Sequence, residues 1–138
     1  MKKILVAVDG SKPSLDAARL ALELATATKA SLTAVYAVVP ILIPGDAPFT
    51  VVNEVMAAET ARAKAVLAEV REALGSPEMA TVDVEGPAAE RVAKLAETEG
   101  FDLVVVGSRG RNAAARVLLG SVADRLMHLC KKPVLIVR

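Results

Sequence analysis

Three glycines and a serine near the end of the chain have the types and the spacing of a phosphate-binding segment. They follow the pattern Gly107-x2-Gly110-x9-Gly120-Ser121, after the apolar run 104–106. Glycine has no Cβ, so a ligand can approach its backbone closely. A helix N-terminus presents free N–H groups to an anion, and Gly120-Ser121 stands where a helix is expected to begin. The segment therefore predicts a cradle for a phosphate group.

The residues around these glycines limit the kinds of phosphate ligand that the segment could bind. Arg109 and Arg111 add positive charge on either side of Gly110. The patterns G-x4-G-K-[ST] and G-x-G-x-x-G are both missing, so the sequence lacks the lysine of a P-loop NTPase and does not support a dinucleotide site. A purely structural alternative stays open. Ser121 and Asp124 also match the capping-box pattern, in which case the serine caps the helix and the glycines serve the turn.

Hydrophobic periodicity predicts the elements that position this segment. Apolar runs rich in β-branched residues indicate buried strands, and apolar residues at three- and four-residue spacing indicate helices between them. The expected strands span 3–8, 31–39, 79–84, 101–106 and 133–137, and the expected helices 14–29, 51–74, 87–98 and 121–130. The third strand is expected near an edge. In the long helix we expect an inward face of Val55, Ala58, Ala65 and Val70.

The alternation of strands and helices predicts a three-layer, doubly wound α/β fold with a five-stranded parallel sheet, in a single domain over residues 1–138. The two common strand orders are 3-2-1-4-5 and 2-1-3-4-5, and ligands bind where the order reverses, outside the carboxyl ends of the strands. The order 3-2-1-4-5 brings the loop 9–11 beside the loop that begins at Gly107. These two loops carry the most distinctive chemistry, so we prefer that order.

The segment 40–48, P-I-L-I-P-G-D-A-P, is predicted to be a loop because it holds three prolines and a glycine. It also carries Ile41, Leu42 and Ile43, which a purely solvated loop would not need. We expect these side chains to pack onto the domain. The alternatives are a lid or a subunit contact.

Composition excludes several classes of protein. Of the 138 residues, 54% are apolar but only 2% are aromatic, and the net charge is +1. Few aromatics and no basic run argue against nucleic-acid binding. The single cysteine, Cys130, excludes an internal disulfide and is expected to behave as a small apolar residue. The single histidine, His128, is expected at the surface, and no catalytic residues are predicted.

No membrane segment is predicted. The apolar run after Lys3 stops at Asp9 and is shorter than the roughly 7–15 residues of a signal peptide core. The segment 34–44 contains Pro40 and falls short of the roughly 20 residues that span a bilayer. We expect a soluble, cytoplasmic protein.

Four separated segments of the chain resemble the universal stress protein family. They are K-K-I-L-V-A-V-D-G-S at the start, F-D-L-V-V-V-G-S-R-G, L-L-G-S-V-A-D, and K-K-P-V-L-I-V at the end. The pattern G-x2-G-x9-G-[ST] is that of the ATP-binding class of the family. The resemblance implies the nucleotide-binding α-hydrolase-like sheet of order 3-2-1-4-5.

The same resemblance implies a ligand and its site. The ligand implied is ATP. Since hard cations bind carboxylate and phosphate oxygens, we expect Mg²⁺ to accompany the phosphates, with Asp9 helping to hold it. Asp9 would contact the nucleoside, the backbone around Ala37 and Val38 would hold adenine, and the glycine segment would bind phosphates and ribose. The site residues implied are Ala7, Asp9, Ala37, Val38, Val106, Gly107, Arg109, Gly110, Gly120, Ser121 and Val122.

The resemblance also implies a homodimer that pairs the last strand, Pro133, Val134, Leu135, Ile136 and Val137, across a two-fold axis. An unprotected apolar edge strand favours such pairing. The expected function is that of an ATP-dependent regulatory, stress-response protein with a protein partner that the sequence does not name. Two alternatives stay open: a slow ATPase or α-pyrophosphate-cleaving enzyme, and an interaction module that uses loop 40–48 without nucleotide.

Overall fold

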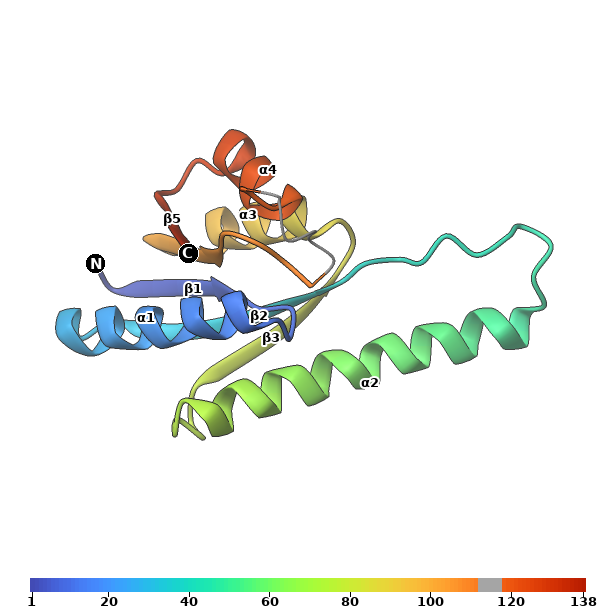
Figure 1. The fold of residues 1–138 in the computed structure, drawn as a ribbon, viewed down its shortest axis with the longest axis horizontal. Helices are drawn as coiled ribbons and strands as arrows, with labels where there is room; N and C mark the ends of the chain where they lie inside the picture. The colour runs from blue at the N-terminus through green and yellow to red at the C-terminus, as the bar shows by residue number, and fades with distance from the viewer. Residues whose placement is uncertain (112–117) are drawn as a thin grey trace.

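Five parallel strands form one sheet in the order β3-β2-β1-β4-β5, which confirms the predicted order. The computed structural model describes residues 1–111 and 118–138. Figure 1 shows their arrangement. The strands are β1 (Lys3–Ala7), β2 (Ser31–Val38), β3 (Ala80–Glu85), β4 (Leu103–Gly107) and β5 (Val134–Val137). The helices are α1 (Lys12–Thr28), α2 (Phe49–Ala73), α3 (Ala88–Thr98) and α4 (Ser121–Leu129).

Helices cover both faces of the sheet, with α1 and α2 on one side and α3 and α4 on the other (Figure 1). Successive side chains of β1 enter opposite cores. Ile4 and Val6 pack with α1 and α2, whereas Leu5 packs with α3 and α4. The central strands are therefore buried on both faces, as their continuous apolar sequence requires. The expected edge position of β3 is confirmed.

α1 starts at a capped turn. The Ser11 hydroxyl accepts a hydrogen bond from the Ser14 N–H at 3.3 Å, and Pro13 occupies the first turn, where its missing N–H removes no helical bond. The buried stripe consists of small side chains, Ser14, Ala17, Ala18, Ala21 and Ala25. These let the helix lie close to the sheet. Leu15 and Leu22, at the margins of this stripe, are half-buried.

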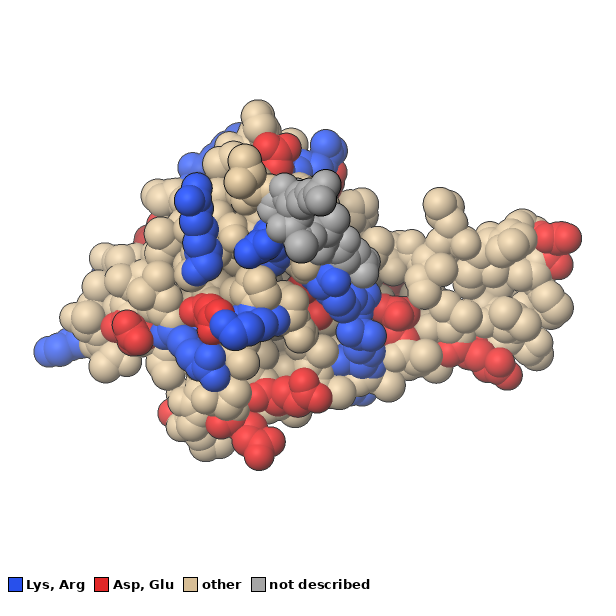
Figure 2. All heavy atoms as spheres, viewed as in Figure 1, with Lys and Arg blue, Asp and Glu red and all other residues tan. Residues whose placement is uncertain are grey.

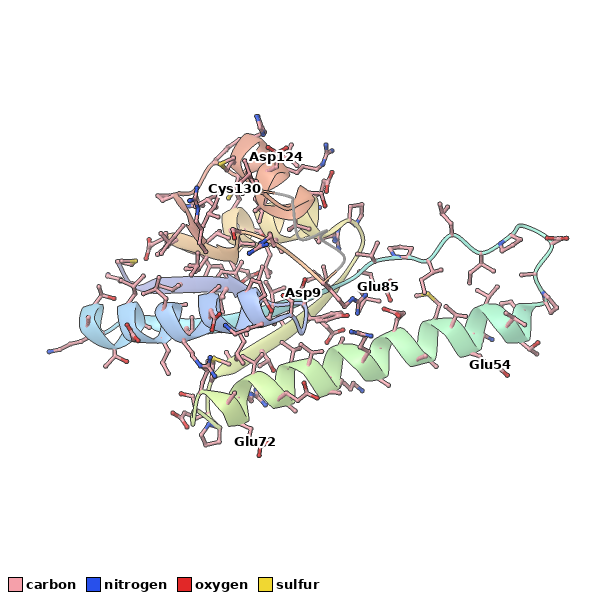
Figure 3. The ribbon with its side chains drawn as sticks, in the orientation of Figure 1. Asp9, Glu54, Glu72, Glu85, Asp124 and Cys130 are labelled. Atoms are coloured by element: carbon pink, nitrogen blue, oxygen red, sulfur yellow. The ribbon has the colours of Figure 1, made fainter. Side chains whose placement is uncertain are left out.

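Only the C-terminal half of α2 packs on the sheet. Its buried residues are Ala63, Val66, Leu67 and Val70. The predicted inward face is therefore wrong in part, since Ala58 and Ala65 are exposed and Val55 is half-buried. The reason is length. A helix of 25 residues is about 37 Å long, whereas the eight residues of β2 span about 26 Å. Figure 3 shows the result, with Glu72 beneath the sheet and Glu54 far beyond it.

The overhanging part of α2 and the loop before it form a projection, residues 39–62, which we call the arm (Figure 1). The expectation that loop 40–48 packs onto the domain is wrong for Ile41 and Leu42, whereas Ile43 is half-buried. Leu42 is 99% exposed, Ile41 is 50% exposed, and Phe49 at the start of α2 is 78% exposed. Figure 2 shows that the visible face of the arm is mostly uncharged, with scattered acidic groups. Among the described residues, no helix is both long and apolar enough to cross a membrane.

Gly107 lets the end of β4 touch the start of α1. A Cβ at this position would lie 2.9 Å from the carbonyl carbon and oxygen of Pro13. We predict that Gly107→Ala lowers the free energy of unfolding by about 1–3 kcal/mol, the range for overpacking a fixed contact. Urea unfolding followed by circular dichroism measures it. Gly45→Ala is the control, because no described atom lies within 4 Å of the added Cβ. Equal losses in the two variants would contradict the account.

Candidate functional site

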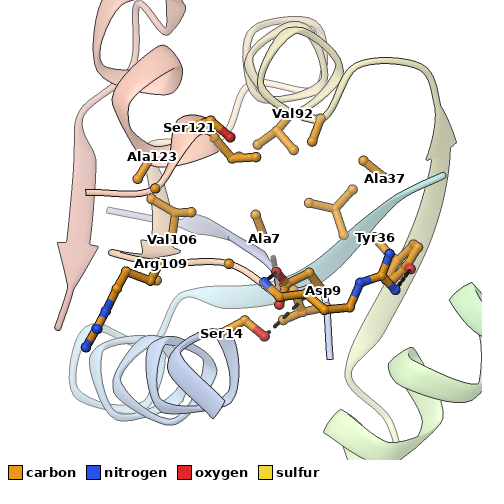
Figure 4. A pocket seen from close by; sticks show the side chains of 18 of the residues that line it. Ala7, Asp9, Ser14, Tyr36, Ala37, Val92, Val106, Arg109, Ser121 and Ala123 are labelled. Atoms are coloured by element: carbon orange, nitrogen blue, oxygen red, sulfur yellow. Dashed lines mark hydrogen bonds between the residues drawn. The ribbon is translucent and has the colours of Figure 1, made fainter. Parts of the chain in front are cut away.

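A cavity of about 680 Å³ opens at the carboxyl ends of β1, β2 and β4 (Figure 4). Its volume lies within the range of small-molecule sites, roughly 300–1,000 Å³. The strand order reverses between β1 and β4, so the cavity occupies the switch point at which ligands bind in open α/β sheets. Most of its lining is aliphatic, and the polar groups come from the loops after β1 and β4, from the first turns of α1 and α4, and from Tyr36 on β2.

The Asp9 carboxylate joins the two loops. Its Oδ1 accepts a hydrogen bond from the Ser11 N–H at 2.9 Å, and its Oδ2 accepts one from the Arg111 N–H at 2.8 Å. The Asp9 N–H donates in turn to the Ser14 hydroxyl at 3.3 Å. Partial burial raises the pKa of Asp9, but the hydrogen bonds from Ser11 and Arg111 outweigh it and leave the pKa below its ordinary value. The group is therefore ionised at neutral pH and acts only as an acceptor.

Gly110 and Gly120 allow close approaches around the cavity, the first to a side chain and the second to backbone. A Cβ on Gly110 would lie 2.9 Å from Asp9 Oδ2, and a Cβ on Gly120 would lie 3.2 Å from the Arg109 Cα. The Gly120 N–H donates to the Ser108 carbonyl at 2.6 Å, which fixes the start of α4 to the end of β4. Both glycines line the cavity, and an added Cβ at either position would force these close neighbours to shift.

The first turn of α4 lies at the wall of the cavity. Gly120 is the N-cap residue and makes no side-chain cap bond, while Ser121 is the first helical residue. The alternative that Ser121 caps the helix is therefore wrong. Gly120 occupies the N-cap position, from which a serine hydroxyl would bond the N–H groups of the first turn, and Ser121 follows it. Ser121, Val122 and Ala123 all line the cavity, and their N–H groups precede the first intrahelical bond, which Asp124 N–H donates to the Gly120 carbonyl.

The two arginines beside Gly110 point in different directions. Figure 4 shows the side chain of Arg109 running away from the middle of the cavity, although the residue contributes to its wall. The Arg111 guanidinium reaches across to β2, where Nη1 lies 3.5 Å from the Tyr36 hydroxyl. Tyr36 itself is 3% exposed.

The structure brings nearly all of the predicted site residues to this cavity. Those that line it are Ala7, Asp9, Ala37, Val106, Gly107, Arg109, Gly110, Gly120, Ser121 and Val122. Val38 does not line it. Its side chain is buried in the core with α1 and α2, and its carbonyl accepts a hydrogen bond from the Gly86 N–H at 3.0 Å. Binding by each residue stays a prediction.

Sequence reasoning missed several lining residues. Tyr36 and Val39 lie close in sequence to Ala37, which was predicted to contact the base. Their position at the end of β2 could therefore have indicated that they line the site. Ala88 and Val92 come from α3, and only the tertiary arrangement brings them here. Away from the cavity, His128 is exposed at the surface, as predicted, and its Nδ1 lies 2.8 Å from the Asp124 carbonyl oxygen. Cys130 is half-buried against the core with α3 and α4.

Comparison with known proteins identifies the family. The sequence model described as the universal stress protein family matches residues 1–138. The chain belongs to this family. A universal stress protein of Methanocaldococcus jannaschii is 33% identical over 140 aligned residues, covering 99% of this chain and 82% of that protein.

Solved structures of the universal stress protein family show the same fold. UspA of Lactobacillus plantarum has a TM-score of 0.89 at 28% identity, covering 99% of this chain and 97% of that chain. A universal stress protein in complex with cAMP has a TM-score of 0.73 at 29% identity, again covering 99% and 97%. Some family members with this fold therefore bind nucleotides.

We predict that Asp9→Asn destabilises this universal stress protein by about 1–3 kcal/mol at pH 7, because an amide opposes one of the two N–H donors that the carboxylate accepts. The pKa of Asp9 is lower in the folded protein than in the unfolded chain, where it is about 3.9. The contribution of the carboxylate to folding stability is therefore complete above the unfolded pKa, and it is lost as pH falls through the folded pKa. The difference between wild type and variant should therefore shrink in strong acid.

Urea unfolding at a series of pH values measures this difference. Asp16→Asn is the matched control, because Asp16 lies on the exposed side of α1 and pairs with Lys12 and Arg19. Its effect should be small and sensitive to salt. Equal stability of wild type and Asp9→Asn at pH 7 would show that the carboxylate does not tie the loops together.

Proposed function

We propose that the cavity binds ATP and that the protein is a nucleotide-dependent regulator of the universal stress protein family. One observation carries the proposal. A cavity of nucleotide size places glycine backbone and the open first turn of α4 opposite an anchored, ionised carboxylate. A family member of similar fold in complex with cAMP supports a nucleotide as the class of ligand.

Each part of the ligand has matching chemistry in the cavity. The phosphates would meet the N–H groups of Gly110 and of the first turn of α4, where the helix dipole favours negative charge. Asp9 would accept a hydrogen bond from a ribose hydroxyl, because it is an acceptor with a lowered pKa. The base would lie against the aliphatic end of the cavity at Ala37 and Val39. The protein would then have an ATP-bound form and an empty form, and partner proteins would recognise the ATP-bound one.

Magnesium would enter with the phosphates. No group of three or more His, Cys, Asp or Glu side chains among the described residues is placed to hold a metal ion. Mg²⁺ is commonly held by one or two carboxylates together with phosphate oxygens and waters. Asp9 and Asp124 line the cavity and are the described carboxylates available for that role.

The lining favours holding ATP over cleaving it. Among the described residues of the wall there is no histidine or lysine, Asp9 already accepts two backbone hydrogen bonds, and the other carboxylate, Asp124, is proposed to hold Mg²⁺. A general base for water needs a proton-accepting group free to approach the reacting oxygen. We therefore place slow hydrolysis second to a regulatory role.

We predict that Gly110→Val weakens ATP binding by roughly 10- to 100-fold, because its Cβ would press on the Asp9 carboxylate at 2.9 Å. Calorimetric titration with ATP and Mg²⁺ measures the affinity, and circular dichroism checks the fold. Gly45→Val is the control, since no described atom lies near its Cβ. Unchanged affinity in Gly110→Val would remove Gly110 from the binding site.

The proposed dimer pairs β5 of two copies. β5 is an edge strand with β4 as its neighbour in the sheet. The carbonyls of Pro133 and Val137 accept hydrogen bonds from the N–H groups of Val104 and Ser108. Since backbone groups alternate in direction along a strand, those of Val134 and Ile136 face the open edge, where they are available to a second copy. The exposed arm favours a second candidate, a contact between arms of two copies through Leu42 and Phe49.

The mass in solution separates these two contacts. Ile136→Pro removes an N–H from the open edge of β5 and should give a monomer by analytical ultracentrifugation. Leu42→Ser combined with Phe49→Ser should leave the dimer intact. The reverse pattern would assign the subunit contact to the arm, and a monomeric wild type would contradict both.

A further inference from the structure

We propose that Arg111 binds the base of the nucleotide, by lying with its guanidinium plane against the ring. This inference rests on the proposed function, because it assigns a residue to the base end of the same site. The implied residues of the family motif include Arg109 but not Arg111.

The position of Arg111 is fixed at both ends. Its N–H donates to Asp9 Oδ2 at 2.8 Å, which holds its backbone at the end of β1. Its guanidinium lies 3.5 Å from the Tyr36 hydroxyl on β2, one residue before Ala37. The side chain therefore crosses from the loop after β4 to the strand at which the base is proposed to lie.

The end of the cavity at β2 is mostly aliphatic, because Ala37 and Val39 line it beside Tyr36. Side chains alternate along a strand, so Ala37 faces the other side of the sheet from Tyr36, and a base at the strand end would have Ala37 on one side and the guanidinium on the other. Tyr36 is the one aromatic residue among the described lining residues, and at 3% exposure its ring has little surface left for stacking. Arginine is planar, weakly hydrated and always charged, so it stacks on aromatic rings. Arg111 is thus the group on this wall that can cover the face of a base.

Charge attraction to phosphate is the competing role, and geometry argues against it. The phosphate segment begins on the β4 side of the cavity and ends at α4, whereas the Arg111 side chain extends toward β2. Its partner there is a neutral hydroxyl. No ion pair between described residues involves Arg111. The side chain can be replaced without removing the Asp9 contact, because that bond comes from the backbone N–H.

The test compares ATP with inorganic triphosphate as ligands of wild type, Arg111→Gln and Arg111→Lys. Arg111→Gln should weaken ATP about three- to tenfold, the range of a cation–π contact, and leave the affinity for triphosphate unchanged. Arg111→Lys keeps the positive charge but lacks the planar guanidinium, so its ATP affinity should lie between those of Arg111→Gln and the wild type. Tyr36→Phe should weaken ATP less than Arg111→Gln and add nothing in that background.

Arg19→Gln is the control for the loss of one positive charge, since Arg19 lies on α1 away from the cavity and pairs with Asp16. Thermal unfolding checks that all variants fold. Equal losses for ATP and triphosphate, or full recovery with lysine, would overturn the inference and assign Arg111 to the phosphates. Unchanged ATP affinity in Arg111→Gln would also overturn it. Failure of the wild type to bind ATP would instead overturn the proposed function.

Discussion

The carboxylate of Asp9 is the contact on which the site depends. It accepts backbone hydrogen bonds from Ser11 in its own loop and from Arg111 in the loop after β4. Burial alone would favour a neutral carboxyl, but these bonds keep the pKa of Asp9 low and the group charged. Because Gly110 leaves no Cβ between the two loops, the carboxylate and the glycine backbone can form one continuous wall. A substitution at either position should disturb the other.

The scaffold explains why two distant stretches of sequence meet here. Small side chains on α1 and the bare Cα of Gly107 let the start of α1 lie against the end of β4. The bond from the Gly120 N–H to Ser108 then places α4 with its first turn at the cavity. The same close backbone contacts, at Gly107 and Gly120, thus fix both the packing of the helices and the shape of the cavity. The site is a consequence of how the strand ends are joined.

Much of this was predictable because it rests on local patterns. The buried strands, their order, and the meeting of Asp9 with the Gly107–Gly110 loop follow from apolar runs and the switch-point rule. The errors have physical causes that periodicity does not encode. The arm is exposed because α2 is longer than the sheet beneath it. Ser121 matched a capping pattern one residue beyond the actual cap. The contact between Tyr36 and Arg111 joins β2 to a loop far along the chain, which no local pattern indicates.

The most direct test of the account is native mass spectrometry of the freshly purified protein, followed by denaturation and identification of any released ligand. The account predicts a bound adenine nucleotide, or its full recovery after incubation with ATP and Mg²⁺, at one molecule per chain. A spectrum of ligand-free protein that stays ligand-free with saturating ATP and Mg²⁺ would contradict the central claim that this cavity is a nucleotide site.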